Sequence, residues 1–132
     1  MEDRLVEDLM TRGVITVPLG SKLTEVVATM CANRVHALVV VDEQGEATGV
    51  VTKVDILHHF NEDLSAITVD EVMTPRLITI SPEARLSEAV SLMLLRRVHQ
   101  LVITKDDPAE RRRPVGMLSV SDVVQALCDL TA

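Results

Sequence analysis

Two short motifs contain the side chains of this sequence that are best suited to catalysis or to ligand binding. Thr52 is followed three residues later by Asp55, and Ser119 is followed at the same spacing by Asp122. A hydroxyl residue three positions before a carboxylate is the capping-box pattern of a helix N-terminus. The same groups could bind a ligand, because a carboxylate can accept hydrogen bonds from two vicinal ribose hydroxyls and a helix N-terminus favours phosphate. Capping alone and ligand binding both stay open at each motif.

The other reactive side chains lack the partners that catalysis needs. No serine or threonine lies in a nucleophile-elbow pattern, and no activated nucleophile accompanies either aspartate. His58 and His59 lie where a helix is expected to end, and the neighbouring carboxylates are too few for a metal site. His36 and His99 occupy equal positions where a strand is expected to begin, with a structural role or a phosphate contact both open. We predict no catalytic residue, no metal site and no enzymatic activity.

Both motifs belong to an internal repeat. Residues 6–41 align without gaps on residues 69–104, and the alignment resumes at Gly49 and Gly116 after a turn that is four residues longer in the second copy. A match of this length indicates a tandem duplication. Because a copy of about 60 residues buries little surface alone, we expect the copies to pack together about a pseudo-twofold axis.

Each copy shows the same order of elements, β-α-β-β-α, which predicts an α/β (α+β) fold class. Apolar residues recur at i, i+3, i+4, i+7 and i+8 in the first helix of each copy, and Cys31 falls on this stripe, so we expect a buried, unreactive thiol. The copies are residues 1–62, with an N-terminal lead-in, and residues 63–132. The expected strands are 14–17, 35–41 and 49–51, then 77–80, 98–103 and 116–118; the expected helices are 23–31 and 53–60, then 86–94 and 120–130.

Composition excludes several classes of function. The net charge of −7 and the presence of one Phe with no Tyr or Trp argue against nucleic acid as the main partner, because such binders carry a basic face and stack bases on aromatic rings. The basic run Arg111–Arg113 is expected to be a solvated loop tip. No apolar run is long enough to span a membrane or resembles a signal peptide, so a cytoplasmic location is expected.

The chain resembles a tandem pair of cystathionine-β-synthase (CBS) domains, called a Bateman module, over about residues 6–130. The likeness depends on several motifs that occur in order and are repeated. They are Val72-Met73-Thr74-Pro75, the apolar runs that end at Pro18 and Pro82, the run from Arg34 to Asp42, and Gly-x-x-Thr/Ser-x-x-Asp at residues 49–55 and 116–122.

The resemblance implies a regulatory module that binds an adenosine-type nucleotide, AMP, ADP or ATP, at two equivalent sites in the cleft between the copies. The first site would combine Thr52 and Asp55 with the strand 77–80, which contains Ile78 and Ile80, and with Val98 and His99. The second would combine Ser119 and Asp122 with the strand 14–17, which contains Ile15 and Val17, and with Val35 and His36.

The sequence departs from AMP-binding relatives at one position. An arginine often follows the histidine in those relatives, and here the residue is Ala37 or Gln100. Lys53, Arg12 and Arg76 are possible substitutes as phosphate contacts. Two alternatives stay open: a module that binds S-adenosylmethionine, and a structural or dimerisation module with empty sites. In each case we expect a homodimer and no tightly bound cofactor, and any regulated protein would be a separate chain.

Overall fold

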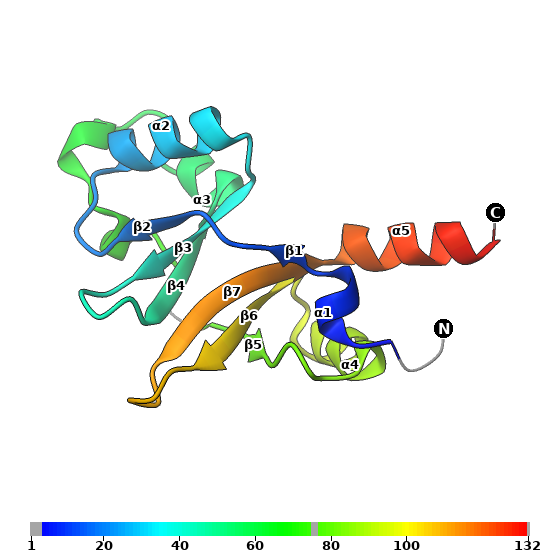
Figure 1. Cartoon of the computed structure of the whole chain (residues 1–132). Coiled ribbons are helices and arrows are strands. Elements are labelled where there is room, and N and C mark those ends of the chain that lie inside the picture. The colour runs from blue at the N-terminus through cyan, green and yellow to red at the C-terminus, as the bar shows by residue number, and fades with distance from the viewer. Residues whose placement is uncertain (1–3, 75–76, 132) are drawn as a thin grey trace. The chain divides into compact units, whose positions relative to one another are not determined.

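The computed structural model describes residues 4–74 and 77–131, which form two compact units (Figure 1). One unit is formed by residues 15–77, and the other by the N-terminal residues up to 14 together with residues 78–132. The borders of these units differ from the borders of the sequence copies. Each copy begins with a lead-in segment, the residues up to 14 in the first copy and residues 63–77 in the second. Each lead-in therefore belongs to the unit that contains the body of the other copy.

The unit of residues 15–77 is built on a three-stranded sheet in the order β2-β3-β4. Strand β2 is parallel to β3, and β3 is antiparallel to β4 across the hairpin turn at residues 42–45. The strands are β2 (Thr16–Pro18), β3 (Ala37–Val41) and β4 (Ala47–Thr52), and the helices are α2 (Leu23–Asn33) and α3 (Lys53–Leu57), with 3-10 turns at Leu64–Ala66 and Val69–Glu71.

The core of this unit includes a residue from the second copy's lead-in. Val69 is fully buried with Leu23, Leu38 and Val51, and its backbone N–H donates to the carbonyl oxygen of Ser21 at 2.7 Å. A few residues further on, Thr74 and Val50 exchange two backbone hydrogen bonds of 2.9 and 3.2 Å. The lead-in is thus an integral part of the unit formed by the first copy.

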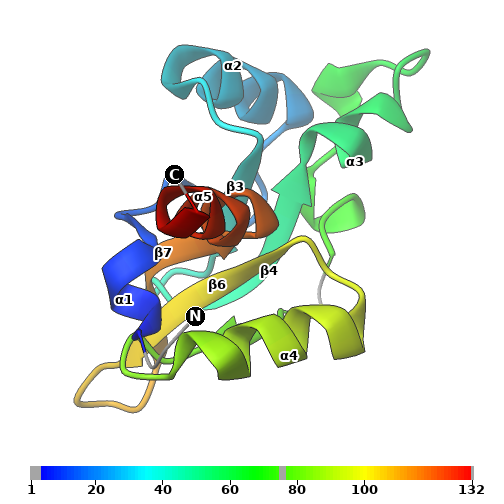
Figure 2. The same ribbon diagram turned by 90° about the vertical axis from the view of Figure 1, so that its right-hand side faces the viewer.

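The other unit has a four-stranded sheet in the order β1-β7-β6-β5, with β5 parallel to β6 and the remaining pairs antiparallel. Helix α4 packs along β6, as Figure 2 shows, and α5 extends from the end of β7. The strands are β1 (Thr11–Arg12), β5 (Thr79–Ile80), β6 (Gln100–Asp106) and β7 (Arg112–Ser119), and the helices are α1 (Val6–Leu9), α4 (Leu86–Arg96) and α5 (Val120–Thr131).

The first copy's lead-in completes this second core. Val6 is fully buried with Leu86, Leu101 and Leu118, and its N–H donates to the carbonyl oxygen of Ala84 at 2.8 Å. The following residues form β1, which adds an antiparallel edge to β7. The exchange of lead-ins is therefore reciprocal between the two copies.

The predicted fold class and order of elements are confirmed. The helices begin at the expected residues, and both α2 and α4 end at an arginine in the left-handed conformation, Arg34 with φ 54° and Arg97 with φ 56°. The first strand of each copy is shorter and begins two residues later than expected, and α3 ends at Leu57, followed by His58 at its C-cap. No helix in the described ranges combines the length and apolar character needed to cross a membrane.

Two expectations about side chains are wrong. Cys31 is exposed, because α2 buries Leu23, Val26 and Met30, and Cys31 lies about 100° around the helix from Met30. The arginine run is not a free loop tip: Arg112 and Arg113 begin β7, and Arg113 Nε donates to Asp107 Oδ2 at 2.9 Å.

Candidate functional site

The motif of the first copy forms the predicted capping box at the start of α3. The backbone N–H of Asp55 donates to Thr52 Oγ1 at 3.2 Å, and the N–H of Thr52 donates to Asp55 Oδ2 at 2.7 Å. The strand β4 places Thr52 at its last position, so that its extended backbone turns directly into the helix. The capping interpretation is confirmed for this motif.

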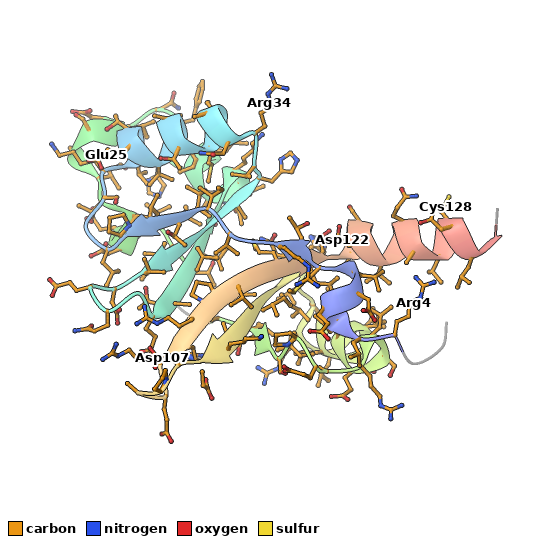
Figure 3. The ribbon with its side chains drawn as sticks, in the orientation of Figure 1. Arg4, Glu25, Arg34, Asp107, Asp122 and Cys128 are labelled. Carbon is orange, nitrogen blue, oxygen red and sulfur yellow. The ribbon has the colours of Figure 1, made fainter. Side chains whose placement is uncertain are left out.

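The second copy repeats this geometry at the junction of β7 and α5, where Figure 3 marks Asp122. The N–H of Asp122 donates to Ser119 Oγ at 3.1 Å, and the N–H of Ser119 donates to Asp122 Oδ2 at 2.8 Å. The same two hydrogen bonds thus form on a different helix with a serine in place of the threonine.

Capping leaves part of each motif available to a ligand. Both aspartates are half-buried and use Oδ2 for the cap, while Oδ1 accepts no hydrogen bond from the residues that the structure describes. The hydroxyls of Thr52 and Ser119 accept a cap bond and still carry a proton that they can donate. Each motif therefore offers one acceptor and one donor, and capping does not exclude ligand binding.

The backbones of the two equivalent histidines, His36 and His99, are hydrogen-bonded to the first residues of the motif helices. The N–H of Lys53 donates to the carbonyl oxygen of His36 at 3.0 Å, and the N–H of Val120 donates to that of His99 at 2.9 Å. Both imidazole side chains are exposed, as is the side chain of Lys53. The first N–H of each helix is consequently used by the fold, and the side chains remain open to solvent.

The candidate residues on the first strand of each copy differ in how much of their side chains is exposed. The carbonyl oxygens of Ile15 and Ile78 accept backbone hydrogen bonds of 3.1 Å from the neighbouring strands β3 and β6, and both side chains are half-buried. Val17 is only 4% exposed and packs in the core, so its side chain presents little surface. Ile80 is half-buried against the core of the other unit.

The candidate site residues fall into two groups, one in each unit. Each unit contains one complete capping motif, one of the two equivalent histidines His36 and His99, and the first strand of one copy. One unit holds Ile15, Val17, His36, Thr52, Lys53 and Asp55, and the other holds Ile78, Ile80, His99, Ser119 and Asp122. Each of the two expected sites takes residues from both units, and their assembly remains a prediction.

Arg12 and Arg76 are the other basic residues that were expected as possible phosphate contacts. Arg12 Nη2 donates to the carbonyl oxygen of Glu7 at 3.2 Å, and Arg76 lies outside the described residues. Across the described parts of the chain, His, Cys, Asp and Glu side chains form no group of three or more that could hold a metal ion.

The glycine of each motif avoids a clash with a neighbouring segment of the chain. A Cβ on Gly49 would lie 2.9 Å from the carbonyl oxygen of Thr74 and 2.6 Å from Met73 Sδ. On Gly116 it would lie 2.7 Å from the carbonyl oxygen of Thr11. The close neighbour is the exchanged lead-in, so each glycine admits the other copy's segment beside the strand that leads to the motif.

Comparison with known proteins identifies the family. The CBS domain family model matches residues 6–62 and 69–129. The chain is 32% identical over 125 residues to arabinose 5-phosphate isomerase KdsD of Pseudomonas aeruginosa, covering 92% of this chain and 37% of that protein. It is 29% identical to a CBS domain-containing protein of Dictyostelium discoideum, of which it covers 90%. The chain thus spans about a third of the first of these relatives and most of the second.

Solved structures show the same fold. The CBS domain pair of protein MJ0100, in complex with 5′-methylthioadenosine and S-adenosyl-L-methionine, matches with a TM-score of 0.85 and 22% identity over 97% of this chain and 98% of that one. A conserved protein from Pyrococcus horikoshii matches with a TM-score of 0.81 and 25% identity over 96% and 95% of the two chains. The two motifs, the reciprocal lead-ins and the two family matches agree: this chain belongs to the CBS domain family and consists of two tandem CBS repeats.

Proposed function

We propose that this chain is a regulatory module that senses an adenosine-type ligand in the cleft between its two CBS repeats, and that it is not itself an enzyme. The observation that carries the proposal is the pair of capping boxes at Asp55 and Asp122, each with an uncommitted Oδ1 atom and a hydroxyl proton beside it. Two vicinal ribose hydroxyls can donate to such a carboxylate. The complex of the MJ0100 domain pair supports adenosine as the recognised group.

An adenine nucleotide, AMP, ADP or ATP, is our first candidate for the ligand. The exposed side chains of His36, His99 and Lys53 lie beside the motifs and can interact with phosphate. The ligand would contact Oδ1 of the aspartate and the hydroxyl proton, so the capping hydrogen bonds can stay in place when it binds.

S-adenosylmethionine, an adenosine derivative without phosphate, is the second candidate. S-adenosyl-L-methionine and 5′-methylthioadenosine are the ligands of the MJ0100 domain pair, and neither carries a phosphate. The residues after the histidines are Ala37 and Gln100, and the net charge of −7 disfavours polyanions. Both candidate classes share the adenosine group that the aspartates would recognise.

Thermal-shift measurements followed by isothermal titration test the proposal on the full chain. AMP, ADP, ATP, S-adenosylmethionine and 5′-methylthioadenosine are the probes, and 2′,3′-dideoxy-ATP is the matched control for ATP that lacks only the ribose hydroxyls. A ligand that binds the native state raises the melting temperature, so at least one probe should raise it while the control should not. If no probe shifts the transition, or if the control binds as tightly as the probes, the ribose assignment is refuted.

We also propose that the chain forms a homodimer. The dimer is expected both for a ligand-sensing module and for the alternative, a structural module whose sites are empty. Helix α5 exposes Val124 (60%), Leu127 (44%) and Leu130 (48%), while Leu57 (64%) and Phe60 (77%) are exposed at the end of α3. Apolar surface of this kind is usually covered by a partner. Sedimentation equilibrium should show a dimer that Leu127→Asp dissociates, whereas Gln125→Asp on the same helix leaves it intact. A wild-type chain that is monomeric at high micromolar concentration contradicts the dimer.

The regulated target is proposed to be another protein or another part of a longer one. This chain covers 37% of the Pseudomonas isomerase and 90% of the Dictyostelium protein, and these two proportions are compatible with both arrangements. A cytoplasmic location stays a prediction from the sequence.

A further inference from the structure

The two capping motifs have different neighbours on the adjacent strand. Thr52 is the last residue of β4, and Ser119 is the last residue of β7. In the antiparallel pairing, Thr52 lies opposite Ala37 on β3, whereas Ser119 lies opposite Gln100 on β6. Directly opposed residues place their side chains on the same face of a sheet, with Cβ atoms about 4.5–5.5 Å apart. The residue opposite each motif is therefore an immediate neighbour of its hydroxyl group.

The packing of the core determines which face of the sheet carries Gln100. The next pair along the two strands, Leu101 and Leu118, is fully buried in the core of the same unit. Because successive side chains of a strand point to opposite faces, Gln100 and Ser119 lie on the face that is turned away from this core. The first copy repeats this arrangement around its own motif. The side chain of Gln100 thus lies beside the second motif, within the same unit.

The amide of Gln100 is not used by the fold. The side chain is half-buried, and it makes no hydrogen bond with any residue that the structure describes. A primary amide has two N–H donors and an acceptor oxygen, so all of these are available to another molecule. The equivalent residue of the first copy, Ala37, is 9% exposed and has only a methyl group. The second motif consequently has a polar cross-strand neighbour that the first motif lacks.

We propose that the two adenosine sites are unequal, because the amide of Gln100 adds a hydrogen bond to the ribose at the site of Ser119 and Asp122. This inference rests on the proposed function. One ribose hydroxyl donates to Asp122 Oδ1, and the neighbouring hydroxyl bonds to the Gln100 amide from across the strand pair. The site of Thr52 and Asp55 lacks this bond and binds the same ligand more weakly. Two unequal sites let one module respond over a wider range of ligand concentration than two equal sites would.

Isothermal titration of single-site variants tests this inference on the full chain, with the adenosine probes named above. Asp55→Ala leaves only the site beside Gln100, and Asp122→Ala leaves only the site beside Ala37. In the Asp55→Ala chain, the similarly sized Gln100→Met should weaken every probe that binds by about threefold to tenfold, which corresponds to the loss of one neutral hydrogen bond. In the Asp122→Ala chain, the same substitution should leave the affinity unchanged, because the amide lies beside the other motif.

Two controls separate a ligand contact from a structural effect. Gln100→Met should leave the melting temperature of the ligand-free chain unchanged, because the amide bonds to none of the residues that the structure describes. Gln44→Ala removes an exposed glutamine side chain in the hairpin between β3 and β4, and it should leave the affinity of both sites unchanged. An equal loss of affinity at both sites in Gln100→Met would show a general structural effect and overturn the inference.

The outcomes distinguish this inference from the proposed function. If the wild-type chain binds none of the adenosine probes, the proposed function fails, and this inference fails with it. If a probe binds and Gln100→Met does not weaken it in the Asp55→Ala chain, only the inference about Gln100 fails. A loss that is confined to the probes with phosphate would assign the amide to phosphate and overturn the ribose contact. A similar loss for probes with and without phosphate is the expected result.

Discussion

The backbone N–H of Lys53, the first residue of α3, lies 3.0 Å from the carbonyl oxygen of His36, just before β3. Val120 and His99 form the same bond at 2.9 Å in the second copy. Each motif helix is therefore held at its start by a backbone bond to the neighbouring strand as well as by its capping box. This double attachment allows the capping side chain to be changed without the loss of the helix.

Substitution of the aspartates should separate ligand binding from capping. Asp55→Ala and Asp122→Ala should each lower the free energy of unfolding by about 0.5–2 kcal/mol through the lost cap. If each carboxylate binds ribose, each variant should also lose one adenosine site, with a penalty of about 1.5–3 kcal/mol per charge-assisted hydrogen bond and at least a tenfold weaker affinity. Isothermal titration of the folded variants measures this loss.

The asparagine variants are the controls for capping. Asp55→Asn and Asp122→Asn can keep the cap bond while they lose the charge, so their stability should stay closer to that of the wild type than the stability of the alanine variants. Their affinity should still fall. Equal affinity in the wild type and all four variants would show that the aspartates are caps only.

The glycine of the first motif should not tolerate a larger side chain. In Gly49→Ala the new Cβ would meet the carbonyl oxygen of Thr74 at 2.9 Å, a backbone atom that cannot move alone. We expect a loss of about 1–3 kcal/mol in the free energy of unfolding, measured by urea titration. Ser91→Ala on the exposed face of α4 is the control, with a change within about 0.5 kcal/mol. A Gly49→Ala variant as stable as this control would contradict the close approach of the lead-in.

Two fragments of nearly equal length test the exchange of lead-ins. Fragment 15–77 contains a complete core, including the fully buried Val69. Fragment 1–62 lacks Val69, and it retains the first lead-in without the core against which that lead-in packs. Fragment 15–77 should show more dispersed NMR resonances and a more cooperative thermal transition than fragment 1–62. The same degree of structure in both fragments would mean that the lead-in adds little to the core.

The exposure of Cys31 predicts that its thiol is accessible. In a Cys128→Ser variant, an aromatic disulfide reagent should label Cys31 in native buffer at a rate close to that in denaturant. A rate that rises sharply only on unfolding would indicate that α2 is covered, and the concentration dependence of labelling would then show whether a second copy of the chain covers it.

The sequence alone was sufficient for the repeat, the order of elements and the two capping boxes. These features depend on local periodicity and on residues three positions apart, such as Thr52 and Asp55, whose interaction is set by the geometry of a helix N-terminus. The resemblance to the CBS family followed from the same local motifs, because they recur in the same order in both copies.

Which core each lead-in joins became clear from the three-dimensional packing. Val6 and Val69 occupy equivalent positions of the repeat, and both are buried. Because both residues are valine, the side chain alone does not determine which core each one completes. The choice depends on non-local hydrogen bonds, such as those between Thr74 and Val50, that local pattern does not encode. The exposure of Cys31 was decided in the same way: the apolar stripe of α2 is wider than the surface that the sheet covers, and packing selects the part that is buried.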